Sequence, residues 1–168
     1  SAYSNFATNG RWAEPYLIEK ITDSDGNIIY QHQVEPKQVI NPLVAAAARR
    51  PLMRVPTEEG TAPRANIGVP QGGKTGTHQS YYDAWYVGFT PRFTTAVWVG
   101  YEAKQQPLVD VTIRGERYSR VYGGTVPAPI WAEYMRAVHD KIPAGEFDEP
   151  AVDYSFLLEP AITTMPIV

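Results

Sequence analysis

Near the amino terminus, two short runs of β-branched and aromatic residues lie within residues 15–33. Between them stands the polar sequence DSDGN at residues 23–27, whose Asp-Gly pair tolerates positive φ angles and is typical of hairpin connections. This alternation of apolar runs and a glycine-containing turn predicts a β-hairpin.

Two other segments carry helix signals. Asn41 and Pro42 precede the run LVAAAARR, so an N-cap residue and a first-turn proline stand at the expected helix start. We expect this helix to stop or kink at Pro51, and residues 52–70 to form turns and loops. Farther along, residues 127–142 begin with Pro-Ala-Pro and carry an apolar stripe at helical spacing, which we expect to pack on a sheet. The stripe is formed by Ile130, Trp131, Tyr134, Met135, Val138 and Ile142.

The middle of the chain has the pattern of a small antiparallel sheet. Residues 83–90 and 93–101 are two strand-like runs separated only by Pro-Arg, a connection too short for parallel strands. Residues 73–77 lead into them by a turn and predict a third strand. Residues 96–99 are all apolar, so both faces of this strand carry apolar side chains, and we expect helices to cover the sheet on both sides. The predicted fold class is α+β, an antiparallel sheet flanked by helices.

Composition narrows the chemistry. The chain has 168 residues, the size of one domain, with 15 Lys and Arg against 18 Asp and Glu and no basic run, so we expect no nucleic-acid partner. It has no cysteine, and its three histidines lack ligand spacing, so we expect no metal and no cofactor. No signal-peptide pattern or membrane-length apolar run is present.

One stretch, GVPQGGKTGTHQS at residues 68–80, matches two motifs with different chemistry. It satisfies the phosphate-loop pattern G-x-x-x-x-G-K-[ST], and it contains K-T-G, which is typical of enzymes that transfer acyl groups through a serine. A phosphate loop joins an apolar strand to a helix. Here the preceding residues are short and polar, Pro70 lies inside the loop, and the following residues favour strands, so the nucleotide hypothesis is disfavoured.

The second interpretation fits a strand edge that binds a peptide. In an extended chain, Thr75 and Thr77 project to the same face, so that two hydroxyls can bind a carboxylate while Lys74 adds a nearby positive charge. Gly76 lets another backbone approach the edge closely. The Thr77 amide then points toward the bound carbonyl as an oxyanion donor. His78, Tyr81 and Tyr82 follow, either lining a cleft or packing in a surface loop.

The run GGKTGTHQSYYDAWYVGFTPRFTTAVWVGYE, with YGGTVPAPIWAEYM downstream and AYSNFATNGRWAEPYLIEKITDSDGNIIY upstream, resembles the C-terminal part of the transpeptidase domain of class A bifunctional penicillin-binding proteins. A T-x-x-G-T-like stretch at residues 57–61 falls in the matching order. The resemblance implies a β-lactamase/transpeptidase-like fold and a serine D-Ala-D-Ala transpeptidase that cross-links peptidoglycan and is acylated by β-lactams. It implies that Lys74, Thr75, Gly76 and Thr77 bind substrate, with Lys74 and the Thr77 amide acting in catalysis.

The resemblance has one large gap: no serine here is followed three residues later by lysine, and no S-x-N occurs. We therefore expect residues 1–142 to be a C-terminal piece of the domain, inactive alone and dependent on an N-terminal part that carries both motifs. We expect residues 143–168 to be a proline-rich extension or tail. The implied location is the outer face of a bacterial cytoplasmic membrane, held by an anchor outside this chain. The alternative is a non-catalytic module that binds peptidoglycan peptides by strand addition at the KTGT edge.

Overall fold

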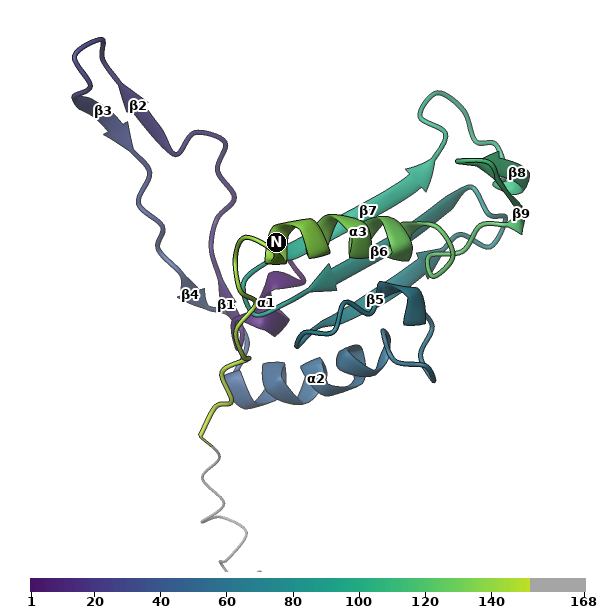
Figure 1. Ribbon diagram of the computed structural model, residues 1–168. Helices are drawn as coiled ribbons and strands as arrows, with labels where there is room; N and C mark the ends of the chain where they lie inside the picture. Colours follow the sequence, from purple (N-terminus) through teal and green to yellow (C-terminus); the bar gives the residue numbers. More distant parts are fainter. Residues whose placement is uncertain (152–168) are drawn as a thin grey trace, which may run out of the picture.

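The computed structural model describes residues 1–151 and builds them into a small mixed α and β fold with four antiparallel sheets (Figure 1). The helical elements are α1 (Ser4–Ala7), α2 (Pro42–Arg54), the 3-10 helix η1 (Pro63–Ala65) and α3 (Pro127–His139). The strands are β1 (Arg11–Trp12), β2 (Lys20–Thr22), β3 (Ile28–Gln31), β4 (Lys37–Gln38), β5 (Gly72–Thr77), β6 (Asp83–Phe89), β7 (Thr94–Gly100), β8 (Val109–Ile113) and β9 (Glu116–Arg120). This confirms the predicted α+β class with an antiparallel central sheet.

The central sheet has the strand order β5-β6-β7, as predicted from the short connections between its strands. Its register pairs Gly76 of β5 with Trp85 of β6, and Trp85 with Trp98 of β7. Because β5 and β7 are the two outer strands among the described residues, each leaves one edge without a strand partner.

Helix α3 covers one face of this sheet (Figure 1). Its Trp131 and Met135 are fully buried and form a core cluster with Tyr86 of the sheet and small residues of η1 and α3. The predicted stripe is wrong in part, because Tyr134 is 55% exposed and Ile142 is 42% exposed. Buried Ala128 and Ala132 widen the packed side of α3 instead, since small residues let the helix lie close to the sheet.

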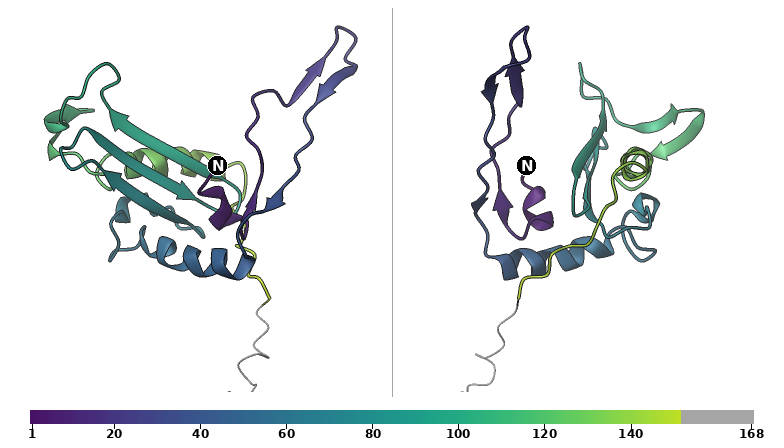
Figure 2. Two further views of the ribbon diagram at one scale, coloured as in Figure 1. Left: turned by 180° about the vertical axis from the view of Figure 1, so that it is seen from behind. Right: turned by 60° about the vertical axis from the view of Figure 1, so that its left-hand side comes forward.

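The opposite face of the sheet differs from the prediction. Seen from behind, only α1 among the helices of residues 1–151 lies against it, at one end, where Phe6 packs on the buried Phe89 with ring centroids 6.2 Å apart, and α2 runs beside β5 (Figure 2). Trp85 and Trp98, side by side on this face with ring centroids 6.3 Å apart, remain 42% and 40% exposed. The apolar pattern in β7 therefore marks a surface left open in this part of the chain.

The hairpin predicted in residues 15–33 is confirmed as β2 and β3, which project away from the body of the molecule (Figure 1). Asp23 accepts hydrogen bonds from the backbone amides of Asp25 and Asn27 at 3.0 and 2.8 Å, which closes the turn. These bonds, and above all the one from the Asn27 side chain, lower the pKa of the Asp23 carboxyl.

Helix α2 begins as predicted but does not stop at Pro51. The Asn41 side chain accepts a hydrogen bond from the Leu43 amide at 2.9 Å, and Pro42 occupies the first turn. The helix then continues through Pro51 to Arg54. Pro51 lies on the exposed side, where solvent can satisfy the Ala47 carbonyl that loses its helical donor. Residues 55–70 contain only the short η1 as regular structure, in line with the loop prediction.

The β8–β9 hairpin was not predicted. Residues 109–113 and 116–120 pair around Arg114 and Gly115, which have φ angles of 53° and 82°. Two successive positive φ angles are typical of a two-residue hairpin turn, and Gly115 is the residue that adopts them most readily. The Arg-Gly pair between alternating runs was the available signal.

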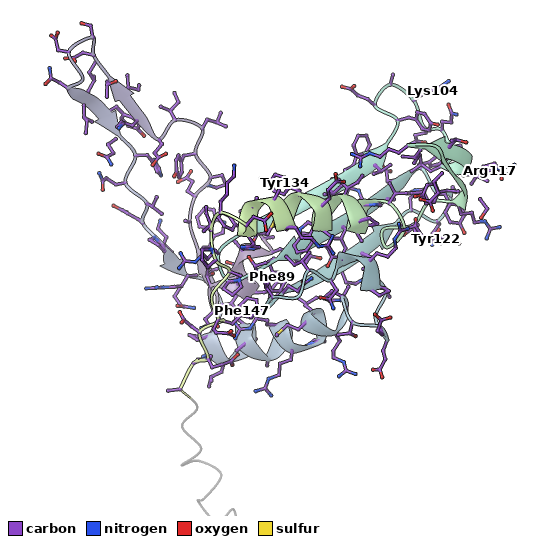
Figure 3. All side chains as sticks on the ribbon, in the orientation of Figure 1. Phe89, Lys104, Arg117, Tyr122, Tyr134 and Phe147 are labelled. Carbon is purple, nitrogen blue, oxygen red and sulfur yellow. The ribbon has the colours of Figure 1, made fainter. Side chains whose placement is uncertain are left out.

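Arg49 of α2 joins three distant parts of the chain. Its guanidinium is 1% exposed and donates to the Phe6 carbonyl at 3.2 Å, the Asp148 carbonyl at 3.1 Å and the Glu149 carboxylate at 2.7 Å. Phe147 lies below the same guanidinium and packs against Phe89 (Figure 3). Thus residues 147–149, within the predicted extension at residues 143–168, pack on the body, while residues 152–168 of that extension lie outside the described residues.

Candidate active site

The KTGT residues form most of β5, and one edge of this strand has no strand partner among residues 1–151. The His78 amide donates to the Asp83 carbonyl at 2.9 Å, so it points toward β6. Because successive amides of a strand point in opposite directions, the Thr77 and Thr75 amides point away from β6, toward the free edge. A strand at this position does not start a helix, so the structure disfavours the phosphate-loop interpretation as the sequence did.

Thr75 and Thr77 lie on the same face of β5, as predicted, and both line a cavity of about 510 Å³. The Thr75 hydroxyl lies 3.1 Å from the Thr61 hydroxyl, and the Thr77 hydroxyl accepts a hydrogen bond from the Gly123 amide at 3.2 Å. The cavity wall is completed by Pro63, Arg64, Tyr122, Gly124 and Thr125. Two hydroxyls, together with backbone amides that point toward the free edge of β5, can donate hydrogen bonds to the terminal carboxylate of a peptide.

Lys74 does not line this cavity. Its side chain lies at the exposed edge of β5, where Nζ donates to the Thr75 carbonyl at 2.9 Å. The structure therefore places Lys74 beside the free edge, one residue from the hydroxyls. The Lys74 ammonium can therefore contact a ligand, or another part of the protein, that lies along the free edge of β5.

Gly123 allows the loop before α3 to lie directly on β5 and β6. A Cβ atom at this position would come within 2.2 Å of the Trp85 carbonyl oxygen and 2.9 Å of the Gly76 carbonyl oxygen. Because both contacts are with backbone, a side chain at Gly123 would displace the loop that walls the cavity. By contrast, a Cβ at Gly76 would meet the Trp85 side chain at 3.2 Å.

The rim of the cavity carries an aromatic and cationic cluster. The Tyr81 and Tyr122 rings meet edge to face, with centroids 5.6 Å apart, and the Arg120 guanidinium lies 5.3 Å from the Tyr81 ring centre. Hydrogen bonding to Tyr81, and then to Arg120, lowers the pKa of Tyr122. Of these residues only Tyr122 lines the cavity; His78 instead packs on Tyr82, with ring centroids 5.1 Å apart.

Tyr81 has a φ angle of 59°, unusual for an aromatic residue. Its amide donates to the His78 carbonyl at 2.9 Å, and its carbonyl accepts from the Leu108 amide at 2.8 Å. These two bonds hold the turn between β5 and β6 in one conformation, which fixes the side chain at the rim.

Sequence reasoning identified the strand but missed much of the wall. Thr61, Arg64 and the segment at residues 122–125 reach the cavity only because η1 and the loop before α3 fold over β5. The glycine pair in YGGTVPAPIW was a usable signal, since adjacent glycines before a helix often mark a close backbone approach.

Comparison with known proteins identifies the family to which this chain belongs. The family model described as the penicillin binding protein transpeptidase domain matches residues 1–136. The chain belongs to this family. Penicillin-binding protein 1A of Aquifex aeolicus is 35% identical over 151 residues, which cover 89% of this chain and 19% of that relative. The chain thus spans about a fifth of the relative's length.

Solved penicillin-binding proteins share the fold. The structure of the penicillin-binding protein PonA1 from Mycobacterium tuberculosis is 28% identical, with a TM-score of 0.75 over 90% of this chain and 40% of that one. Penicillin-binding protein 1A from Haemophilus influenzae is 26% identical, with a TM-score of 0.73 over 89% and 27%. The family membership and the transpeptidase-like fold expected from the sequence are confirmed. Within residues 1–151, no helix combines the length and apolar character needed to cross a bilayer.

Proposed function

We propose that this chain supplies the carboxylate-binding and oxyanion half of a serine D-Ala-D-Ala transpeptidase that cross-links peptidoglycan stem peptides. The observation that carries the proposal is the free edge of β5, where the Thr77 amide points outward beside a cavity lined by the Thr75 and Thr77 hydroxyls. Family membership supports the reaction class, and the site chemistry supports the role of this piece.

In the proposed reaction, the donor peptide lies along β5 as an added strand. Its terminal carboxylate accepts hydrogen bonds from the Thr75 and Thr77 hydroxyls, and the Thr77 amide donates to the carbonyl of the bond to be cut. Lys74 contacts the serine of an S-x-N motif and the substrate carboxylate. These positions orient the donor for a nucleophile that comes from elsewhere in the domain.

The nucleophile is a serine of an S-x-x-K motif, which this sequence does not contain. Its oxygen bonds to the donor carbonyl carbon, the carbon–nitrogen bond breaks, and D-Ala leaves with a proton on its amine. An amine of a neighbouring stem peptide then attacks the ester, which forms the new amide and returns the proton to the serine. A β-lactam follows the first half of this path, because its ring amide opens to acylate the same serine.

The rest of the domain is the proposed partner of this chain. The unpaired edge of β7 and the exposed Trp85 and Trp98 offer the hydrogen-bonding and apolar surfaces on which such a part would pack. The assembled domain then works on peptidoglycan at the outer face of a bacterial cytoplasmic membrane.

Covalent labelling with a fluorescent penicillin tests the proposal. The complete protein, with the segments that carry S-x-x-K and S-x-N, is expected to be labelled at a serine outside this chain, and residues 1–168 alone are expected to stay unlabelled. Prior incubation with unlabelled benzylpenicillin should abolish the label. A complete protein that takes no label but still binds stem peptides would favour the non-catalytic module instead, and a label on a serine of this chain would also contradict the proposal.

A further inference from the structure

The cavity beside β5 contains a formal charge that the KTGT strand does not provide. Among the described residues that line it, Arg64 is the only one with a charged side chain; the others are threonines, glycines, Pro63 and Tyr122. Lys74 is not part of the lining. The one positive side chain in this lining therefore comes from a different element, the 3-10 helix η1.

Arg64 is held at the wall by a backbone contact. Its Nη1 donates to the Thr125 carbonyl at 3.1 Å, and both residues line the cavity. Thr125 also closes the loop after Tyr122, whose amide donates to the Thr125 hydroxyl at 2.9 Å. The guanidinium is thus tied to the same loop that donates from Gly123 to the Thr77 hydroxyl.

Arg64 also lines a second cavity, beside Glu116, Tyr118 and Glu133, and the Tyr118 hydroxyl is one of its neighbours, but Arg64 pairs with neither carboxylate within residues 1–151. The nearby carboxylates are engaged by others: Glu133 accepts from Arg114 at 2.9 Å, and Glu116 accepts from the Tyr118 hydroxyl at 2.6 Å. Arg64 forms no ion pair in this part of the chain. Since a guanidinium has five N–H groups in a planar fork, one bond to a carbonyl leaves donors for a carboxylate.

A carboxylate that enters this cavity loses part of its hydration. Two neutral hydroxyls replace some of the lost hydrogen bonds but do not balance the negative charge. A guanidinium in the same wall does balance it, and it binds a planar carboxylate with defined geometry. The arrangement therefore favours a terminal carboxylate over a neutral group of the same shape.

We propose that Arg64 is a further substrate-binding residue, which holds the terminal carboxylate of the donor peptide, or of a β-lactam, together with Thr75 and Thr77. This inference rests on the proposed transpeptidase function and adds to it the source of charge selectivity. Arg64 contacts the carboxylate and not the reacting carbonyl, so its loss weakens capture of the ligand more than it slows the chemical step.

The test measures acylation of the complete protein by benzylpenicillin, which carries a carboxylate, in three variants. Arg64→Gln is expected to lower the second-order acylation rate constant about tenfold, the scale of one charged hydrogen bond at a partly open site. Arg64→Lys keeps the charge and is expected to restore most of the rate. The matched control is Arg136→Gln, because Arg136 also ties α3 to a loop carbonyl, Asn66, at 2.8 Å but does not line the cavity.

Ionic strength separates a charge contact from a structural one. The rate constant of the unchanged protein should fall as salt increases, and that dependence should be weaker in Arg64→Gln. Acylation of Arg64→Gln within twofold of the unchanged protein, or an equal loss in Arg64→Gln and Arg136→Gln with equally lowered melting temperatures, would overturn the role of Arg64. Absence of acylation in the unchanged protein would overturn the proposed transpeptidase function itself, so the two failures are distinguishable.

Discussion

Thr77 has a hydroxyl inside the cavity and a backbone amide at the edge of β5 that is free among residues 1–151, and we propose that both bind one donor peptide. Thr75 offers a second hydroxyl on the same face, and Lys74 stands one residue away at the exposed edge. This division follows from strand alternation, so it could be predicted from the spacing alone. Thr61 and Arg64 could not, because they reach the cavity only when the segment around η1 and the loop before α3 fold over β5.

Substitutions in β5 should therefore affect acylation directly. We predict that Lys74→Ala and Thr77→Val in the complete protein each lower the acylation rate constant for benzylpenicillin by about 10² or more, the size of losing one group of an oxyanion or anion site. Stopped-flow acylation kinetics would measure this. Thr112→Val serves as the control, since Thr112 is an exposed strand threonine of β8 away from the cavity, and its rate should be unchanged. Unchanged kinetics in Lys74→Ala and Thr77→Val would remove both residues from the site.

At the scale of elements, local signals predicted the ladder β5-β6-β7, the β2–β3 hairpin and the starts of α2 and α3. The local signals failed at positions where the solvent exposure of a side chain, which the sequence does not give, determines the structure. Pro51 does not end α2, because its side of the helix faces solvent and the helix also packs beside β5. Tyr134 has the spacing of a core residue but is exposed, since alanines carry the contact of α3 with the sheet.

The exposed Pro51 gives a stability prediction. Proline inside a helix costs about 3 kcal/mol, and removing proline returns about 1 kcal/mol of chain entropy to the unfolded state. We therefore predict that Pro51→Ala stabilises the fold by about 1–2 kcal/mol, seen as a higher melting temperature of the complete protein. Pro56→Ala is the control: Pro56 is buried and lies outside the helix, so its loss should lower stability. A lower melting temperature for Pro51→Ala would show that the proline fits the helix without cost.

At the scale of the whole molecule, we propose that the described residues form one side of a larger site. The sheet has α3 on one face and exposed Trp85 and Trp98 on the other, and its outer strands have free edges. In the proposed function, these two open surfaces take different occupants: a peptide donor at β5 and the rest of the domain at β7. The sequence predicted that both faces of the sheet are covered, because apolar side chains on both faces of a strand indicate burial on both faces. The pattern does not tell which segment, inside or outside this chain, covers each face.

In the proposed function, the Thr77 amide binds the carbonyl oxygen of the donor, and the Thr75 and Thr77 hydroxyls bind its carboxylate. The most direct measurement is the structure of the complete protein acylated by benzylpenicillin. We predict that the carbonyl oxygen of the acyl group lies about 2.7–3.1 Å from the Thr77 amide nitrogen, the span of an oxyanion contact. The penicillin carboxylate should lie in the same cavity against the Thr75 and Thr77 hydroxyls. An acyl group whose carbonyl points away from Thr77, with its carboxylate outside the cavity, would contradict the account.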